Sequence, residues 1–520
     1  MTNRYKWKIK KWREYSYKIL WTMAAIFVLL LFWAVLSPGP SCAAEDETLD
    51  DILSDFDDKP SELSENKSEN VLDGFDDPPE DTRPNPSEDD FLEGFNDEIV
   101  QMDIPKDEDI KPPSIFSLDG YTKLGASYAV AHDKPENGNT DWRGLSRLRK
   151  DLNLELNARF SKQWQARVTG KGAWDAAYAI KGRDEFTNNV IDHYEKEVEL
   201  GETYIQGSLT DRLDIKFGRQ VVVWGKSDNI RVTDVLNPLN LREPGITDIE
   251  DLRLPVTMTR LDYYIGNWSV TGIALHEIRF NKNPEYGNDF YPGATPPPHD
   301  DKPGSDVGNT EYAASINGIF SGWDISFYGA DYYNDTPHVQ LVSPGLPPVV
   351  KRRHARLKML GTAFNVATGN WLLKTEAAWI QGFKFFNAPG KTWSRTDILA
   401  GLEYSGFTDT TLTIEAVNRH INGFDKTLKS APDSAQPDEF QWTARASRDF
   451  LNDTLTLTLL LSTYDSKGED GAYQRFTAEY DITDFLQIST GIVLYSSGDL
   501  AVFKNIGDND RLFCEIRYNF

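Results

Sequence analysis

Alternation of apolar and polar residues is the feature that most constrains this chain. Residues 113–520 contain repeated segments of about 10 to 17 residues that alternate in this way and are rich in Thr, Tyr, Val and Trp. In DTLTLTLLLS, residues 453–462, every second residue from Leu455 to Leu461 is leucine. Successive side chains of a β-strand point to opposite faces, so this period predicts strands rather than helices. We therefore predict an all-β fold for residues 113–520.

The connections between these segments alternate in length. About eighteen strands, or sixteen at the lower bound, fit the pattern. They are expected at residues 116–130, 144–160, 163–180, 196–209, 212–224, 256–265, 267–279, 310–320, 322–334, 352–368, 370–386, 393–406, 409–421, 437–450, 453–466, 472–481, 484–496 and 509–520. Short joins such as GNW and SGW alternate with longer ones that follow the odd-numbered strands. Short periplasmic turns opposite longer outer loops are typical of outer-membrane barrels. The pattern predicts a transmembrane antiparallel β-barrel with both ends in the periplasm; a periplasmic all-β protein of about two domains is the alternative.

The C-terminal segment RLFCEIRYNF, residues 511–520, supports the membrane prediction. It places Leu512, Ile516 and Phe520 on one face and mostly polar or charged residues on the other. A last strand that ends in phenylalanine resembles the strand that bacterial outer-membrane barrels present to their assembly machinery, so Phe520 is the expected contact with that machinery. A mean hydropathy of −0.51 with 12% aromatic residues suits a barrel with one face in lipid and one in water. Outer-membrane lipid is then an expected partner.

The N-terminus has the organisation of a secretory leader. Basic residues between Arg4 and Lys18 precede the uncharged stretch ILWTMAAIFVLLLFWAVL, residues 19–36, and the small-residue stretch SPGPSCAA follows. This order predicts a signal peptide over residues 1–44. An uncleaved anchor is the alternative, because an uncharged stretch of this length approaches the ~20 residues that span a bilayer.

Residues 45–112 form an acidic segment rich in Pro and Ser. Such a composition cannot bury enough apolar surface to offset chain entropy, so we expect a disordered periplasmic tail. Three copies of the pattern L-x-x-F-D/N-D interrupt it. Their apolar residues are Leu53 and Phe56, Leu72 and Phe75, and Leu92 and Phe95. A Leu and a Phe three residues apart suit an amphipathic turn in the groove of a periplasmic protein partner; a solvating spacer is the alternative.

The join at residues 225–255 is the most informative connection. It is dense in charge, yet it also carries Val235, Leu236, Leu239 and Ile246. Loops of this length in compact proteins are usually functional. Apolar residues on a long loop need a surface to pack on, so we expect this loop to fold into the barrel as a constriction or plug. An exposed outer loop is the alternative.

The sequence around this join resembles a known family. GRQVVVWG at 218–225, NPLN at 237–240 and LP at 254–255 match its pattern, and ETYI at 202–205 is similar to its E-A-Y-V segment with Thr in place of Ala. These motifs resemble a Gram-negative outer-membrane family catalogued as domain of unknown function 1302, over roughly residues 115–520. The resemblance implies a porin-like barrel that moves hydrophobic compounds or lipids, often beside an inner-membrane efflux-type transporter. It supplies no substrate-binding residues.

Nine residues around this join are candidates for a lumen constriction. They are Glu202, Lys216, Arg219, Gln220, Trp224, Lys226, Asp228, Asn237 and Asn240. Alternation places Lys216, Gln220 and Trp224 toward the lumen. Arg219 then has the wrong parity, so either a β-bulge shifts the register or Arg219 lies at the aqueous rim. The charged candidates either select among solutes as fixed charges or form ion pairs that hold the loop inward.

Other polar residues within predicted strands, such as Glu376, Glu415 and Arg419, are expected to face the lumen. The basic run KRRHAR, residues 351–356, opens a predicted strand at its outer end. It is expected either to contact the acidic sugars and phosphates of outer-leaflet lipid or to hydrate the rim.

The remaining features favour a function without catalysis. The chain contains no G-x-S-x-G, H-E-x-x-H or P-loop motif, and its two cysteines, Cys42 and Cys514, form no metal-binding pattern. No cofactor is implied, and a net charge of −26 argues against a nucleic-acid partner. We therefore predict a non-enzymatic outer-membrane barrel for import or export of amphipathic or hydrophobic solutes or lipids. A structural adaptor that anchors a periplasmic complex is the second hypothesis, and a hydrolase with catalytic groups at the rim is the third.

Overall fold

A computed structural model describes residues 115–136, 139–345 and 348–520 of the chain. The predicted signal peptide at 1–44 and the predicted tail at 45–112, with its three L-x-x-F repeats, lie outside the described residues. Among the residues that are described, no helix has the length and apolar character needed to cross a membrane.

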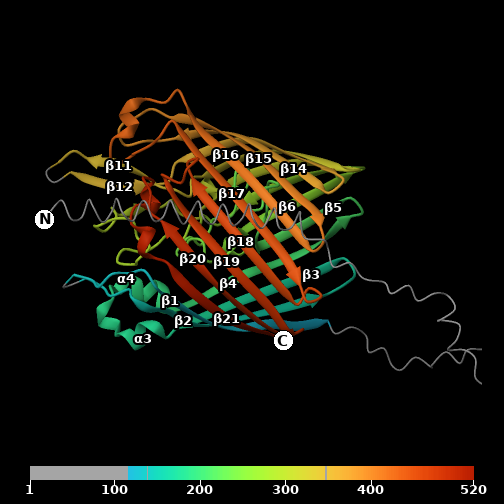
Figure 1. Ribbon diagram of the computed structural model, residues 1–520. Helices are drawn as coiled ribbons and strands as arrows, with labels where there is room; N and C mark the ends of the chain where they lie inside the picture. Colours follow the sequence, from blue (N-terminus) through green and yellow to red (C-terminus); the bar gives the residue numbers. More distant parts are fainter. Residues whose placement is uncertain (1–114, 137–138, 346–347) are drawn as a thin grey trace, which may run out of the picture. The chain divides into compact units, whose positions relative to one another are not determined.

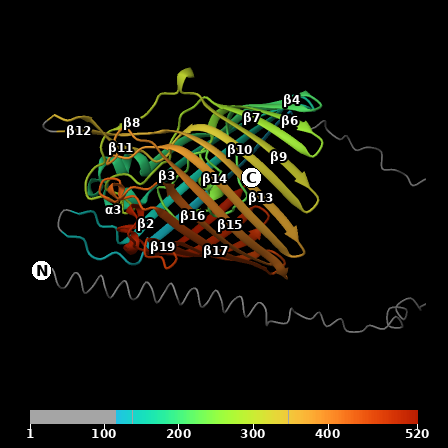
Figure 2. The same ribbon diagram turned by 90° about the horizontal axis from the view of Figure 1, so that it is seen from above.

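Eighteen antiparallel strands form one closed sheet around a central lumen (Figure 1). The wall strands are β1 (Phe116–Ala129), β2 (Gly144–Arg159), β3 (Trp164–Asp175), β4 (Lys196–Thr210), β5 (Leu213–Gln220), β6 (Val256–Ile265), β7 (Trp268–Leu275), β9 (Glu311–Phe320), β10 (Trp323–Tyr333), β13 (Arg356–Thr368), β14 (Trp371–Phe383), β15 (Trp393–Phe407), β16 (Thr410–Asn422), β17 (Asp438–Phe450), β18 (Leu455–Tyr464), β19 (Gly471–Thr483), β20 (Leu486–Ser496) and β21 (Arg511–Asn519). Each strand pairs with the wall strands before and after it, and β1 pairs with β21 to close the ring. Figure 2 shows the strands tilted across the barrel, as closure of a sheet requires.

The connections carry small additional elements. These are α3 (Ala177–Lys181), η3 (Arg183–Glu185), α4 (Asn188–Val190), η4 (Ile191–Glu195), α5 (Ile249–Leu252), η5 (Val307–Asn309), η6 (Lys426–Lys429), η7 (Ala501–Phe503), η8 (Ile506–Asp508), and a separate sheet of β8 (Asp300–Asp301), β11 (His338–Ser343) and β12 (Val349–Arg353). All of them lie on the long connections. We call that end of the barrel the long-loop end and the opposite end the short-turn end. Phe116 pairs with Ala158 beside a short turn, so β1 begins at the short-turn end.

The predicted barrel is confirmed, and each predicted strand corresponds to a wall strand. Four boundaries differ by four or more residues. The strands predicted at 212–224 and 267–279 end at Gln220 and Leu275, where the chain turns into the barrel. The other two differ for local reasons. The strand predicted at 163–180 stops at Asp175, because the carboxylate of Asp175 accepts hydrogen bonds from the amides of Leu148 and Ala177 and turns the chain into α3. The strand predicted at 352–368 begins at Arg356, because the residues before it form β12 in the separate sheet.

Large apolar side chains cover the outer face of the wall. On β2, Leu152, Leu154 and Leu156 are exposed, and on β15 Ile398 is 60% exposed and Leu402 is 37% exposed. On the lumen face, Asn153 and Glu155 of β2 and Asp397 of β15 are polar, whereas Leu399 of β15 belongs to an apolar cluster. This alternation, with an apolar band outside and polar groups inside, is the arrangement of a barrel surrounded by hydrocarbon.

Aromatic residues mark the short-turn end. Trp164, Trp268, Trp323 and Trp371 are each the first residue of their strand, directly after a short turn. Three of these indoles are more than a third exposed. Tryptophan prefers the boundary between hydrocarbon and head groups, so these residues indicate where one membrane interface lies.

The last strand completes the ring by pairing on both sides. The backbone N–H of Phe520 donates to the carbonyl of Gly120 at 2.9 Å, and the N–H of Gly120 donates in return at the same distance. Leu512, Ile516 and Tyr518 are exposed on the outer face. On the inner face, Glu515 forms an ion pair with Lys123 at 3.0 Å.

A charged residue on the outer face of the wall should destabilise the barrel, whereas a charged residue on the lumen face should not. We expect Ile398→Arg to lower the free energy of unfolding from lipid vesicles by about 2–4 kcal/mol, because the guanidinium enters hydrocarbon. Asn317→Arg on β9 is the control, since Asn317 lines a cavity inside the barrel. Equal losses for both variants, measured by urea titration in vesicles, would contradict the assignment of the two faces.

Candidate functional site

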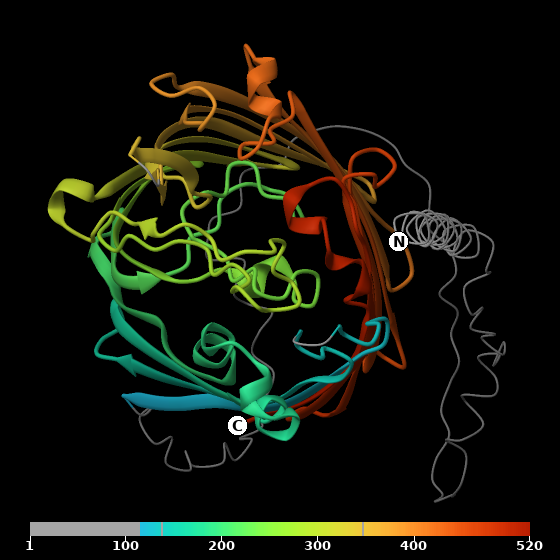
Figure 3. The same cartoon turned by 90° about the vertical axis from the view of Figure 1, so that its left-hand side faces the viewer.

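Residues 221–255, which we call the plug segment, fold into the barrel. Figure 3 views the barrel along its axis and shows this green segment inside the ring of strands. Val222, Ile230 and Leu236 are buried in one apolar cluster with lumen-facing residues of β6, β7, β9, β10 and β13–β16. The structure therefore places the predicted loop 225–255 inside the lumen rather than outside, because its apolar residues find their packing surface on the inner wall.

A carboxylate on β14 binds the start of the plug segment. Glu376 is buried and accepts hydrogen bonds from the backbone N–H groups of Lys226 at 2.6 Å and Ser227 at 2.9 Å. It also accepts from the N–H and the hydroxyl of Thr233 at 3.1 and 2.8 Å. The backbone of an irregular segment has no strand partner, so a charged acceptor that satisfies several N–H groups fixes its path.

A second carboxylate on β16 repeats this arrangement. Glu415 is fully buried and accepts from the backbone N–H groups of Asp228 at 2.9 Å and Asn229 at 3.0 Å. Beside it, Lys374 on β14 forms ion pairs with Asp228 and with Glu403. Sequence reasoning placed Glu376 and Glu415 in the lumen but missed that they hold the plug segment.

The far part of the plug segment contacts other regions of the wall. Arg242 pairs with Glu197 on β4 at 2.9 Å, and Glu243 pairs with Arg147 on β2 at 3.3 Å. The hydroxyl of Tyr495 on β20 donates to the carbonyl of Pro244 at 2.6 Å. These contacts and those on β14 and β16 lie on widely separated strands of the sheet, so the plug segment crosses the lumen.

Residues 276–299, which we call the second segment, also enter the barrel. The N–H of Leu241 donates to the carbonyl of Lys282 at 2.8 Å, and the N–H of Lys282 donates to the carbonyl of Leu239 at 2.9 Å. Farther on, Asp289 pairs with Arg511 of β21 at 2.5 Å. Sequence reasoning treated this stretch as an ordinary outer loop. The sequence feature that indicates an inward fold is the pair of aromatic residues Phe280 and Phe290, both of which are buried in the structure.

Several predicted candidates lie where β4 and β5 meet the plug segment. Lys216 faces inward, with its ammonium 3.6 Å from the ring centroid of Tyr204. Gln220 is fully buried and donates to the carbonyl of Met258 at 3.2 Å. Glu202 accepts from the N–H of Val221 at 3.0 Å. Of these three, Lys216 keeps its polar end turned to the lumen, whereas the other two stabilise the entry of the plug segment.

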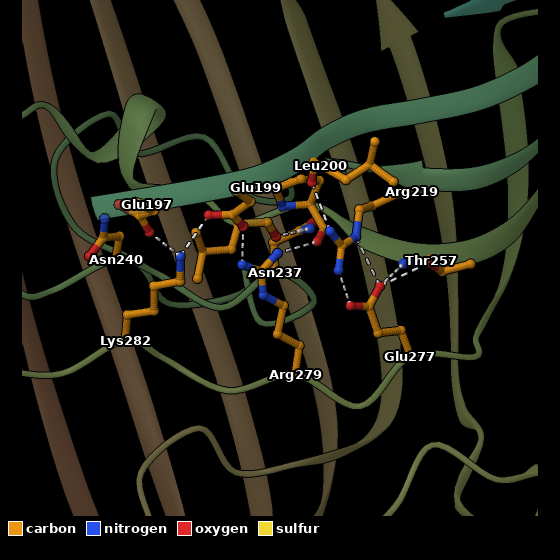
Figure 4. Close-up of polar contacts among 12 residues, drawn as sticks. Glu197, Glu199, Leu200, Arg219, Asn237, Asn240, Thr257, Glu277, Arg279 and Lys282 are labelled. Atoms are coloured by element: carbon orange, nitrogen blue, oxygen red, sulfur yellow. Dashed lines mark hydrogen bonds and ion pairs between the residues drawn. The ribbon is translucent and has the colours of Figure 1, made fainter. Parts of the chain in front are cut away.

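Arg219 lies on the outer face near the end of β5. It pairs in register with Thr203 and Thr257, and the pairing of β5 with β6 is continuous there, so of the two explanations for its parity the β-bulge is not found. Its guanidinium forms an ion pair with Glu277 (Figure 4). Burial raises the pKa of the Glu277 carboxyl, but hydrogen bonds from Arg219 and Thr257 outweigh burial and hold the pKa below its ordinary value. Glu277 therefore stays ionised at neutral pH and keeps the pair intact.

The two candidate asparagines have structural roles. Asn237 is fully buried; its side chain accepts from the N–H of Val222 at 2.8 Å and donates to the carbonyls of Gln220 at 3.1 Å and Leu254 at 2.9 Å. It therefore joins the beginning and the end of the plug segment. Asn240 accepts from the guanidinium of Arg242 at 2.9 Å. Neither contact requires a solute.

The remaining candidates lie beside a cavity of about 280 Å³ between the plug segment and the wall. Trp224 stacks on Tyr328 with ring centroids 4.8 Å apart, and Lys226 pairs with Asp324 at 2.5 Å. The lining also includes Arg260, Thr271, Ser315 and Asn317 from β6, β7 and β9. Asp324 directly follows the first residue of β10, so the cavity lies toward the short-turn end. Aromatic surface beside charged groups suits a molecule with both characters.

The basic run at 351–356 is partnered within the protein. Arg352 pairs with Asp300 at 3.3 Å and Arg353 with Asp301 at 2.9 Å, where β12 and β8 run parallel. His354 lies 3.4 Å from Asp300. These acidic partners reduce the positive charge that the sequence alone offers to outer-leaflet lipid. Within the described ranges, no group of three or more His, Cys, Asp or Glu residues is arranged to hold a metal ion.

Comparison with known proteins yields one family and several solved structures. The family model described as "Protein of unknown function (DUF1302)" matches residues 24–520. No curated protein matches. Among solved structures, OccAB1 of Acinetobacter baumannii is 12% identical, with 78% of this chain and 96% of that chain covered and a TM-score of 0.46. A BenF-like porin of Pseudomonas fluorescens is 12% identical, with 78% of this chain and 98% of that chain covered and a TM-score of 0.46. OccK2 (OpdF) of Pseudomonas aeruginosa, solved in complex with glucuronate, is 13% identical, with 78% of this chain and 98% of that chain covered and a TM-score of 0.44.

Loss of the β16 carboxylate should release the plug segment without opening the barrel. We expect Glu415→Ala to weaken local protection by about 2–3 kcal/mol, because two buried N–H groups lose a charged acceptor. Hydrogen exchange at Asp228 and Asn229 measures this loss. Glu155→Gln on β2 is the matched control, since Glu155 pairs with Arg167 away from the plug segment. Unchanged exchange in Glu415→Ala would contradict its role as an anchor.

Proposed function

The chain belongs to the DUF1302 family of proteins of unknown function, and we propose that it is an outer-membrane barrel for the passage of amphipathic or hydrophobic solutes, lipids included. The observation that carries this proposal is the plug segment, which crosses the lumen and leaves a cavity with mixed lining beside it. A barrel of this width without such a segment would hold an aqueous channel.

The cavity lining favours an amphipathic solute over a sugar. Val222 and Trp224 of the plug segment supply apolar surface opposite Tyr328. Lys226, Asp324 and Arg260 supply charge on the same lining. Solute sites combine an apolar wall with a few placed polar groups that fix orientation. A molecule with an apolar body and a charged end meets both requirements.

Passage requires the plug segment to yield, and its attachments allow this. It is held by hydrogen bonds to Glu376 and Glu415 and by ion pairs such as Lys226–Asp324, rather than by pairing along a strand. Such contacts break and re-form individually, whereas the wall strands share continuous ladders. We propose that a solute displaces part of the plug segment while the strand ladders of the wall stay paired.

Removal of the plug segment tests the proposal. Replacing residues 228–250 by a short Gly/Ser linker should raise single-channel conductance in planar bilayers, because the lumen loses its main obstruction. The control is the same kind of replacement at residues 338–353, which include β11 and β12 at the long-loop end. This variant should keep a conductance near that of the wild type. If the first deletion leaves conductance and solute flux unchanged, the plug segment is not the constriction.

A single charge change should alter ion preference. Asp324→Asn leaves Lys226 without its partner at the cavity, so we expect anions to be favoured more than in the wild type. The reversal potential in a salt gradient reports this change. Asp262→Asn is less suitable, because Asp262 is buried against Thr271; Asp119→Asn at the start of β1 is the control. An unchanged reversal potential would exclude this cavity from the ion path.

We propose in addition that residues 45–112 recruit a periplasmic protein of an inner-membrane efflux-type system through the three L-x-x-F repeats. The support is the repetition itself, since three weak motifs on one tether raise the effective concentration of each. The triple variant Phe56→Ala/Phe75→Ala/Phe95→Ala should lose a partner that each single variant retains. Pull-down with residues 45–112 measures this, and capture that survives the triple change would refute the role of the repeats.

An adaptor barrel with a closed lumen is the second candidate. It is favoured by the attachment of the plug segment to well-separated strands, including β2, β4, β14 and β16. The conductance and flux measurements distinguish the two candidates: an adaptor carries no solute, and its partner still binds when the plug segment is removed.

A further inference from the structure

The pairing of the wall is interrupted between β4 and β5. On its other side, β4 pairs with β3 as far as Lys196. With β5 it pairs only from Thr203 to Thr210. Residues 196–202 therefore form a strand edge that has no strand partner on the β5 side. The chain leaves β5 after Gln220 and turns inward as the plug segment, so nothing continues the ladder.

Two of the three wall strands that follow β4 are short. β5 and β7 each contain 8 residues, whereas β4 contains 15. A transmembrane strand of ordinary tilt needs about 9–11 residues to cross the hydrocarbon. β6 contains 10 residues, within this range, so only β5 and β7 fall short of it; at the long-loop end β4 extends beyond all three. A lateral gap results at the long-loop end.

Apolar side chains border this gap on its outer side. Val198 is 93% exposed and Leu200 is 48% exposed on the outer face of the unpaired edge, and Trp174 of β3, which pairs with Lys196, is 48% exposed. Apolar residues on the outer face indicate hydrocarbon rather than water. Unpaired backbone groups are not tolerated there unless protein covers them or they line a polar cavity.

Side chains, rather than a strand, close the gap: those of the second segment on the lumen side, and that of Arg219 on the outer face (Figure 4). Lys282 of the second segment pairs with Glu197 at 2.7 Å and with Glu199 at 2.6 Å, and Arg279 also pairs with Glu199. Arg219 donates to the carbonyl of Leu200 at 2.7 Å. We call this set of contacts the latch.

We infer that the gap between residues 196–202 of β4 and the tops of β5–β7 is a lateral portal, closed by the latch, through which a single-chain amphiphile moves between the lumen and the adjacent lipid leaflet. The inference rests on the proposed passage function and specifies its route. The apolar chain passes Val198 and Leu200, while the charged head group exchanges partners with the carboxylates and cations of the latch.

The chemistry of the latch suits repeated opening. Its contacts are ion pairs and one hydrogen bond to a backbone carbonyl, so its opening does not unravel any wall ladder. Ion pairs that water can reach are individually weak, and the head group of an amphiphile offers equivalent charges in exchange. A portal closed by strand pairing would instead lose a cooperative ladder each time it opened.

A covalent lock tests the portal in the full-length barrel. Glu199→Cys/Lys282→Cys is made in a Cys42→Ser/Cys514→Ser background, because Cys514 is free and exposed. A short bifunctional methanethiosulfonate then ties β4 to the second segment, and reduction reverses the tie. The barrel is inserted into preformed vesicles, and nitrobenzoxadiazole-labelled lysophosphatidylcholine is added outside. The fraction that becomes protected from external dithionite measures transfer to the opposite leaflet.

The expected result is loss of probe transfer on locking and recovery on reduction, with conductance in planar bilayers unchanged. Lys123→Cys/Glu515→Cys, which ties β1 to β21 where their pairing is continuous and leaves the plug segment and the latch free, is the matched control and should leave transfer intact. Transfer that continues in the locked barrel, or no transfer in an unlocked barrel that conducts, overturns the portal alone. A barrel that neither conducts nor transfers the probe overturns the proposed passage function as well. Heat-dependent migration on gels establishes that each variant is folded.

Discussion

The need to satisfy every backbone hydrogen-bonding group in a medium without water shapes this molecule. It explains why the wall closes on itself through β1 and β21 and why the C-terminal residue pairs with Gly120. Inside the lumen the same need is met by side chains. Glu376 and Glu415 are acceptors for the amides of a segment that has no strand beside it. At the unpaired edge of β4, Arg219 satisfies the carbonyl of Leu200 in the same manner.

Charge inside the barrel is largely matched charge. Most of the acidic and basic groups near the plug segment form ion pairs across different strands or segments, as Lys374 does with Asp228 and Glu403. These ion pairs act together with the apolar cluster around Val222, Ile230 and Leu236 to hold the plug segment inside the lumen. They also leave charged groups beside aromatic surface such as that of Trp224, the combination on which the proposed passage of amphiphiles rests.

The wall was predictable from the sequence because a period of two is a local signal that each strand carries by itself. The anomaly at Arg219 was predictable for the same reason, and only the register with Thr203 and Thr257 decided between its two explanations. The interior was less accessible. The partners of Glu376 and Glu415 lie far away in the chain, and no local pattern connects a strand carboxylate with a distant loop amide. The basic run at 351–356 shows the same limit, since Asp300 and Asp301 supply its counter-charges from another loop.

The contacts of Asn237 have a consequence for how such a barrel diversifies. Because one amide side chain joins the carbonyls of Gln220 and Leu254 and the N–H of Val222, the two ends of the plug segment meet at a fixed point beside the wall. The residues between them form a cassette that can lengthen, shorten or change composition while the flanking strands keep their register. Exchange of this one internal loop would therefore reshape the interior of the barrel and leave its wall as it is.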